Sequence, residues 1–340
     1  MSLTPKKPIP TGAVRYNTDS NKMEVYIGDT WMQVAVSTPN LDGGARAIRA
    51  GGQVGGSPFP RTDTMDFVTI PTAGNATDFG NLTQVKFGPA GAGSKTRAVF
   101  MAGGTPSRLS EIDFVTFSST GNAADFGDMT VARAAGGMAG HSNETRALLS
   151  AGSTPSSDEN DTIDFITIAS TGNGVDFGNL TQAVSGIMAS GNATRGLLAG
   201  GSYLPAYAYR NTIDIVTIAT TGNAQDSGFD VTTTGSGSCC ENSIRVLYQV
   251  ASGDNKQIET VTIASLGNSF DFGTLTQTND SGSFATSDPT RGLFGLNTPS
   301  GGTNIMEYIS MSTGGTAVDF GDLTQAITNS GATSNAHGGL

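Results

Sequence analysis

Short stretches of this chain alternate their side chains with a period of two. Within residues 162–169, for example, Ile166 and Ile168 alternate with Phe165 and Thr167. Such stretches are rich in Ile, Val, Thr and Phe, which favour strands. Gly172 and Asn173 then follow, and this dipeptide reverses the chain tightly because both residues accept positive φ. The pattern predicts short strands joined by tight turns, and therefore an all-β chain.

The alternating stretch occurs six times, beginning at Met65, Ile112, Ile163, Ile213, Ile258 and Met306. An arginine precedes each copy, at spacings of 46 to 51 residues: Arg46, Arg97, Arg146, Arg195, Arg245 and Arg291. A period near 50 residues is typical of β-propellers, which close several four-stranded sheets into a ring. We expect four strands per unit, which in the third unit cover residues 131–138, 146–150, 162–169 and 175–182.

Glycine doublets and a later aromatic residue also recur. The doublets are Gly51-Gly52, Gly103-Gly104 and Gly200-Gly201, and the aromatic residues are Phe79, Phe126, Phe177, Phe272 and Phe320. The order of strand, doublet, loop, strand, turn and aromatic residue resembles the kelch repeat. This resemblance implies a six-bladed kelch-like β-propeller over residues 37–340, in which each sheet covers the faces of its neighbours.

The end of the chain matches the start of a further unit. Residues 333–340 align with residues 190–197, so the sequence ends where a seventh unit would begin. We expect this tail to pair with the first unit and to remove an exposed sheet edge. Residues 33–37 compete for the same place, and the sequence leaves the choice open.

Residues 12–36 have a pattern of their own. Two alternating segments, 13–17 and 23–26, are followed by a third that contains Trp31. This short β-meander is similar to modules of tail-fibre and other virion proteins of tailed bacteriophages, and with the repeats behind it the chain resembles structural proteins of marine cyanophages. The resemblance implies that residues 1–36 form an attachment module that uses Tyr16, Tyr26 and Trp31. Since so short a segment holds no core alone, it must dock elsewhere.

Composition argues against several classes of function. A net charge of -11 argues against nucleic-acid binding, and no apolar run approaches the length of a membrane span. His141 and His337 are the two histidines and lie in unrelated sequence contexts, so we expect no metal or other cofactor. Cys239 and Cys240 are expected to be reduced thiols, because adjacent cysteines rarely bridge each other.

One acidic residue per unit recurs in the third strand: Asp66, Asp113, Asp164, Asp214, Glu259 and Glu307. With the six arginines, these residues can be read as catalytic carboxylates beside an anion site. A residue that every unit carries more simply serves a need that every unit has. We therefore expect structural arginine–carboxylate links within or between units, and no catalytic residue.

The loops between the second and third strands differ in length and composition. We expect ligand contacts from the first such loop, with Phe59 and Arg61, and from the fourth: Tyr203, Tyr207, Tyr209 and Arg210. Aromatic side chains and arginine suit recognition of a sugar ring or a protein surface, because they add contact area at low entropic cost. Packing of these side chains on the propeller itself is the alternative.

Together, these expectations predict a non-enzymatic virion structural protein that is assembled in the host cytoplasm. It would display loops of a fibre or adhesin for recognition of a host-surface glycan or protein. Its partners would be other virion proteins and sister chains, with a trimer expected by analogy to tail fibres. The alternatives are a purely architectural capsid-decoration, neck or baseplate protein, and a glycan-processing enzyme.

Overall fold

The computed structural model describes most of the chain, namely residues 9–18, 22–33, 45–55, 58–134, 139–156, 159–203, 208–232, 237–249, 256–280, 282–298 and 301–340. The regular secondary structure of these residues is entirely strand, so the prediction of an all-β chain is confirmed. The chain divides into two compact units, Met1–Gly43 and Gly44–Leu340. The domain boundary expected after residue 36 falls outside the described residues and stays a prediction.

The smaller unit is a three-stranded antiparallel sheet of β1 (Val14–Asn17), β2 (Lys22–Ile27) and β3 (Thr30–Gln33), as the alternation predicted. Tyr26 and Trp31 are cross-strand partners whose ring centroids lie 5.3 Å apart. Arg15 lies over the Trp31 ring at 4.2 Å and pairs with Glu24 at 2.7 Å. One face of this sheet is therefore organised around a charged and aromatic cluster.

Among the described residues, the larger unit has six sheets of at least four strands, numbered here 1 to 6. Sheet 1 contains β31 (Gly331–Ser334), β4 (Arg46–Ala50), β6 (Thr64–Thr69) and β7 (Thr77–Asn81). Sheet 2 contains β8 (Ala90–Gly93), β9 (Arg97–Thr105), β10 (Ser107–Thr116) and β11 (Ala124–Asp128). Sheet 3 contains β12 (Gly140–Ser142), β13 (Arg146–Ser150), β14 (Asn160–Thr167) and β15 (Val175–Val184).

Sheet 4 contains β16 (Met188–Gly191), β17 (Arg195–Ala199), β20 (Thr212–Thr217) and β21 (Gln225–Asp230). Sheet 5 contains β22 (Ser238–Glu241), β23 (Arg245–Gln249), β24 (Gln257–Thr262), β25 (Phe270–Thr274) and β29 (Gly315–Thr316). Sheet 6 contains β26 (Phe284–Ser287), β27 (Arg291–Thr298), β28 (Gly301–Ser310), β30 (Val318–Thr328) and β5 (Gln53–Val54). A separate ribbon pairs β18 (Ser202–Tyr203) with β19 (Ala208–Tyr209).

The first strands of the six sheets contact one another in a closed order. This order is β31, β8, β12, β16, β22, β26 and β31 again. β31 comes from the end of the chain and pairs antiparallel with β4, so the prediction that the tail joins the first unit is confirmed. In the competing segment, Gln33 lies in β3 and pairs with Glu24, while residues 34–37 lie outside the described residues.

The first strands are short and consist largely of small residues, as in Ala90–Gly93 and Gly331–Ser334, both wholly buried. Small side chains allow six strands to approach one another closely. The expected first strand of the third unit, at residues 131–138, was wrong in position: residues 131–134 lie outside the named strands, and residues 135–138 lie outside the described residues. β12 lies at Gly140–Ser142, where glycine and serine give no apolar alternation for sequence reasoning to detect. The other three strands of that unit lie within two residues of their predicted positions.

The Gly-Asn turns join neighbouring sheets as well as reversing the chain. Gly121 N–H of sheet 2 donates to the carbonyl of Phe79 in sheet 1 at 2.7 Å. In the same way, Gly74 N–H of sheet 1 donates to the carbonyl of Phe320 in sheet 6 at 2.7 Å. A Cβ atom at Gly80 would overlap the Gly121 carbonyl, and Gly80 itself has φ +140°. The glycines of the recurring Asp-Phe-Gly and Gly-Asn segments thus let two sheets approach closely.

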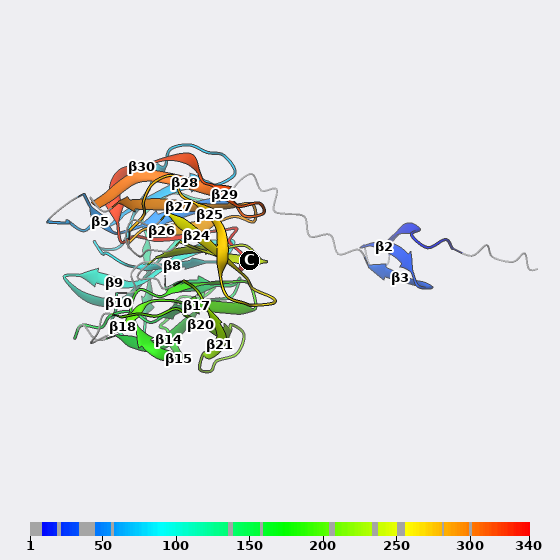
Figure 1. Ribbon diagram of the computed structural model, residues 1–340, viewed down its shortest axis with the longest axis horizontal. Helices are drawn as coiled ribbons and strands as arrows, with labels where there is room; N and C mark the ends of the chain where they lie inside the picture. The colour runs from blue at the N-terminus through cyan, green and yellow to red at the C-terminus, as the bar shows by residue number, and fades with distance from the viewer. Residues whose placement is uncertain are drawn as a thin grey trace, which may run out of the picture. The chain divides into compact units, whose positions relative to one another are not determined.

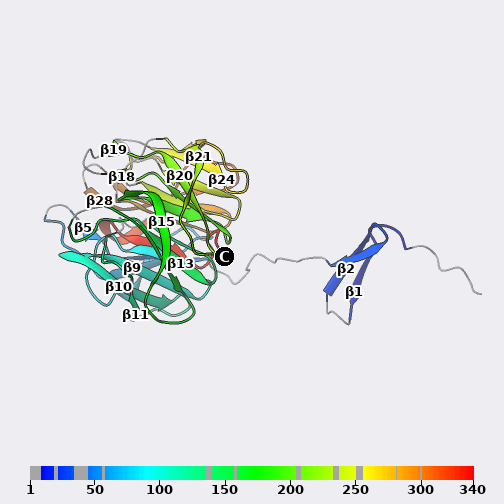
Figure 2. The same ribbon diagram turned by 90° about the horizontal axis from the view of Figure 1, so that it is seen from below.

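The two ends of the larger unit differ. β5, β18 and the β9–β10 hairpin lie at one end, and the C-terminus lies towards the other (Figures 1 and 2). The first of these is called the loop end below, because the connections between second and third strands meet there. The residues expected to bind a ligand belong to those connections.

Candidate functional site

The six recurring acids are buried, and each one accepts a hydrogen bond from a threonine of the preceding sheet. The acceptor–donor pairs are Asp66–Thr324, Asp113–Thr83, Asp164–Thr130, Asp214–Thr181, Glu259–Thr232 and Glu307–Thr276. The Asp66–Thr324 pair joins sheet 1 to sheet 6. These carboxylates therefore bind sheets together, as their recurrence in every unit indicated.

The cations beside these acids are different from those predicted. Four buried side chains pair with the four aspartates: Arg49–Asp66, Lys86–Asp113 at 2.6 Å, Arg133–Asp164 at 2.9 Å and Arg210–Asp214. The predicted link between these acids and the recurring arginines was wrong. It was also wrong to expect Arg210 to contact a ligand, because its buried guanidinium is already bound to Asp214 and Thr181.

Most of the recurring arginines bind backbone carbonyls of the next sheet. The donor–acceptor pairs are Arg46–Phe117, Arg97–Ile168, Arg146–Ile218, Arg195–Ile263 and Arg291–Ile70, at 2.6 to 3.0 Å. Arg245 lies over the Phe272 ring at 5.1 Å. These arginines lie at the start of the second strand, whereas the acids pair near its far end, and this separation explains why the two sets do not meet.

The predicted loop residues have different environments. Phe59 is 42% exposed, and Tyr209 is 51% exposed. Tyr203 is half-buried and packs against the core of sheets 2 to 4. Tyr207 lies outside the described residues. Phe59 and Tyr209 are thus presented to solvent at the loop end, while Tyr203 helps to hold its loop in place.

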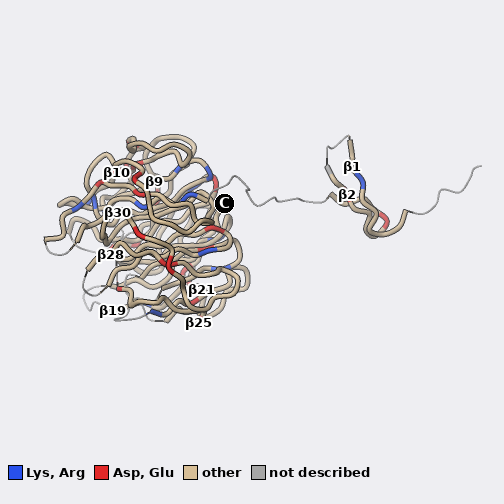
Figure 3. The backbone as a smooth tube through the Cα atoms, turned by 90° about the horizontal axis from the view of Figure 1, so that it is seen from above, with Lys and Arg blue, Asp and Glu red and all other residues tan. Residues whose placement is uncertain are grey.

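A cluster at the loop end includes two residues that sequence reasoning missed. Arg61 and Arg108 share the ring of Phe87, with their guanidinium carbons 5.2 Å and 5.4 Å from its centroid. Burial and the neighbouring charge of Arg61 lower the pKa of Arg108. No recurring frame contains Phe87 or Arg108, so no pattern in the sequence indicated that they meet Arg61. Figure 3 shows basic segments at this end of the larger unit.

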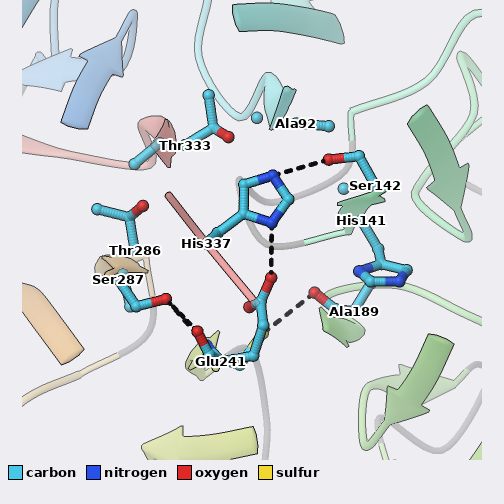
Figure 4. Close-up of a pocket in the computed structure, with 14 residues that line it drawn as sticks. Ala92, His141, Ser142, Ala189, Glu241, Thr286, Ser287, Thr333 and His337 are labelled. Atoms are coloured by element: carbon cyan, nitrogen blue, oxygen red, sulfur yellow. Dashed lines mark hydrogen bonds and ion pairs between the residues drawn. The ribbon is translucent and has the colours of Figure 1, made fainter. Parts of the chain in front are cut away.

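A second candidate site is a cavity where the first strands converge, called the axial cavity. It has a volume of about 30 Å³, which is room for about two water molecules. Residues of all six first strands line it, and His337 enters from the C-terminal segment (Figure 4). Three of the lining side chains are titratable and close together: His141, Glu241 and His337.

Glu241 breaks the pattern of the first strands. The residues in register with it in the other sheets are Ser334, Gly93, Ser142, Gly191 and Ser287. Its carboxylate lies 3.3 Å from His337 Nδ1 and accepts from the Ser190 hydroxyl at 2.5 Å. Burial alone would raise the pKa of Glu241, but His337, His141 and Ser190 together hold it below the ordinary value.

His141 is buried without a hydrogen-bond partner on either ring nitrogen. Its pKa is lowered to about 4, mainly by burial, with the charge of Glu241 opposing the shift and the charge of His337 adding to it. His141 is therefore neutral near pH 7. Although the two histidines lie in unrelated sequence contexts, the fold brings both to one carboxylate, which their positions in the sequence did not indicate.

Ser142, His337 and Glu241 follow one another in space like the serine, histidine and acid of a hydrolase triad. Their hydrogen bonds, however, do not allow His337 to take a proton from Ser142. His337 Nε2 lies 3.2 Å from Ser142 Oγ and 3.0 Å from the carbonyl of Gly93. A carbonyl only accepts, so Nε2 carries a proton there, and Ser142 Oγ donates its own proton to Gly93 O at 2.8 Å. An Nε2 that is already protonated cannot act as the base for Ser142.

Metal ligation and thiol chemistry also find no support in the described part of the chain. No group of three or more His, Cys, Asp and Glu side chains there could hold a metal ion. Cys239 and Cys240 are buried free thiols, and burial raises the pKa of both, which disfavours the reactive thiolate. Within the same residues, no helix is long and apolar enough to cross a membrane.

Comparison with known proteins adds no family. No protein-family model matches the chain, and no curated protein matches its sequence. The loop end and the axial cavity are therefore the features from which a function can be proposed.

Proposed function

We propose that the larger unit is a six-bladed kelch-like β-propeller and that the chain is a non-enzymatic bacteriophage virion protein which displays loops for host-surface recognition. Support for the ring comes from the closed contact order of the six first strands. The links between sheets 6 and 1 are of the same kind as those between the other sheets: a Gly-Asn turn, a threonine–acid bond and an arginine–carbonyl bond.

One observation carries the recognition role. The recurring polar residues are used in bonds between sheets, whereas the exposed aromatic residues Phe59 and Tyr209 belong to loops that differ from unit to unit. A rigid ring that holds variable loops at one end is well suited to binding a surface, because the scaffold limits the entropy lost on binding.

The axial cavity supports a structural role rather than catalysis. The segment around His337 crosses from sheet 1 towards sheets 3 and 5, since Cβ atoms at Gly339 and Gly338 would overlap the Ser142 carbonyl and Asn242. The Ser142 hydroxyl is buried and committed to Gly93. The cavity is also too small for a sugar residue, which leaves glycan processing there without support.

The smaller unit supplies a surface for attachment. Five apolar side chains that lie on one face of its sheet are exposed: Val14, Tyr16, Met23, Ile27 and Met32. Tyr26 and Trp31 lie on the opposite face. Burial of the apolar face against a virion protein or sister chains is favoured by the hydrophobic effect. The proposed location on the virion and the trimeric state rest on the sequence resemblance to phage proteins.

The test measures binding of the full chain to host cells and to an array of host-surface glycans. We expect binding that weakens by at least about fivefold in the double variant Phe59→Ala/Tyr209→Ala, because contact aromatics often contribute more than 1 kcal/mol. Phe270→Ala is the matched control, since Phe270 is also exposed but lies at the start of β25, outside these loops.

Absence of binding in both assays would overturn the recognition role and favour the purely architectural one. Shortening of host polysaccharide during incubation would instead favour a glycan-processing enzyme. Imaging of the intact particle tests the virion assignment, which fails if no density matches the chain.

A further inference from the structure

We propose that Arg61 and Arg108 form a binding site for the acid group of an anionic polysaccharide, on the loop that also carries the exposed Phe59. This inference rests on the proposed recognition function and names the class of ligand. Most arginines of the larger unit make an ion pair or a hydrogen bond to the backbone of a neighbouring sheet.

Arg61 and Arg108 are exceptions in how they use their guanidinium groups. Among the described residues, Arg61, Arg108 and Arg245 make neither an ion pair nor a side-chain hydrogen bond, and Arg61 Nε is buried without a partner. Arg245 is the single described arginine over the Phe272 ring, whereas Arg61 and Arg108 both contact the Phe87 ring. Two unpaired guanidinium groups therefore lie together at the loop end.

The neighbouring acid does not neutralise this pair. Glu111 lies on the same strand as Arg108, but its carboxylate accepts from Gln84 and lies 3.6 Å from Lys86 Nζ. Like charges that share one ring repel each other, and the pKa of Arg108 is lowered partly for this reason. An anion bound at this cluster would relieve this repulsion and receive charge-assisted hydrogen bonds.

The backbone around Arg61 is fixed in advance. Val54 N–H donates to the Pro60 carbonyl at 2.8 Å, and Gln53 forms a β-bridge with Arg61. Between Pro58 and Pro60, Phe59 is held at φ +52°, a left-handed conformation that is costly for a bulky residue. The loop therefore loses little entropy when it binds, because its shape is set by two prolines and by strand contacts.

The exposed Phe59 ring favours a sugar as the carrier of the acid group. Aromatic rings cover the apolar C–H faces of sugars, because both surfaces leave water on contact. The aromatic ring and the two arginines together match a polymer that alternates apolar sugar faces with carboxylate or sulfate groups. An acidic polypeptide would satisfy the arginines but has no equivalent face for Phe59.

The test uses the full chain and four polymers: polygalacturonate, dextran sulfate, neutral dextran and polyglutamate. We expect the wild type to bind polygalacturonate or dextran sulfate more tightly than the other two, with affinity that falls as salt is added. The double variant Arg61→Gln/Arg108→Gln should bind at least about tenfold more weakly, from the loss of charge-assisted hydrogen bonds. Arg245→Gln, the matched control, should bind as the wild type does.

A structural role for the pair would give a different result. Because repulsion between the two charges offsets their attraction to the Phe87 ring, the double variant should melt close to the wild-type temperature, whereas loss of a structural pair would lower it clearly. Unchanged affinity of the double variant, or tighter binding of polyglutamate than of both anionic polysaccharides, would overturn the inference. If the double variant binds host cells as well as the wild type does, the recognition function is supported and this binding site is rejected. If neither protein binds cells or polymers, both the recognition function and the binding site are rejected.

Discussion

The boundaries between sheets and the loop end use arginine in opposite ways. Between sheets, Arg133 is fully buried, and its guanidinium binds Asp164 and the Leu149 carbonyl. At the loop end, Arg61 and Arg108 are half-buried and face no carboxylate among the described residues. The same side chain is thus a structural bond in one region and a free hydrogen-bond donor in the other.

Solvent explains the difference. A buried charge without a partner costs several kcal/mol, so each acid between sheets must be paired with a cation or, as Glu259 and Glu307 are, hydrogen-bonded in the folded state. At the surface, water solvates a guanidinium well, and an unpaired arginine costs little. Recurring residues therefore point to structure, and departures from the repeat, such as Glu241 or the Arg61 loop, point to candidate function.

The largest expected effect comes from breaking a buried pair between sheets. Asp164→Ala leaves the Arg133 charge buried without its carboxylate and also removes the acceptor of Thr130. We expect a loss of about 3–5 kcal/mol in the free energy of unfolding. Urea unfolding followed by circular dichroism measures it.

The double variant Asp164→Leu/Arg133→Met separates the two contributions. It removes both charges and replaces them with apolar groups, so most of the lost stability should return. A double variant as unstable as Asp164→Ala would mean that the ion pair itself stabilises the protein, contrary to the view that its removal matters mainly through the unpaired charge.

The axial cavity offers an effect of intermediate size that depends on pH. The pKa of His141 is about 4 in the folded protein and near 6.5 when the chain unfolds, so the unfolded state binds an extra proton between these values. The folded protein should thus lose about 3 kcal/mol through this group as the pH falls from 6.5 to 4. Unfolding free energies at several pH values measure this slope.

His141→Ser is the matched variant, because Ser190 occupies the corresponding place in sheet 4. Its stability should change less with pH across this interval. The lowered pKa of Glu241 adds a further loss of stability as the pH falls below its ordinary value. This contribution remains in the variant, reduced by the missing charge of His141, because His337 and Ser190 are unchanged. Equal slopes for wild type and variant would show that His141 is not the buried neutral group described above.

Much of the fold could be predicted because its signal repeats. Alternation identified strands such as the one predicted at residues 162–169, which the structure places at Asn160–Thr167, and the period near 50 residues predicted equal units. The first strands escaped prediction because strands of glycine, alanine and serine have no apolar alternation. Their position follows from convergence of the six sheets, which is a tertiary property that no local pattern records.

The candidate sites were harder to predict, for a related reason. The cations that bind the buried aspartates do not recur at a fixed spacing: Arg49 precedes Asp66 by 17 residues, Arg133 precedes Asp164 by 31, and Arg210 precedes Asp214 by 4. A periodic search therefore selected the recurring arginines instead. Glu241 had a usable signal, since it replaces a glycine or serine found in the other five first strands.

The smallest expected effect comes from a partly exposed bond between sheets. Arg146 lies over Phe165 at 4.6 Å and donates to the Ile218 carbonyl at 2.9 Å, whereas Arg245 only lies over Phe272. Arg146→Gln should cost about 1–2 kcal/mol, from a charge-assisted hydrogen bond and a contact with the ring, and Arg245→Gln less than about 1 kcal/mol. Thermal unfolding of both variants measures the difference. Equal losses would mean that stacking alone accounts for the recurring arginines, and that the carbonyl bonds contribute nothing measurable to holding the sheets together.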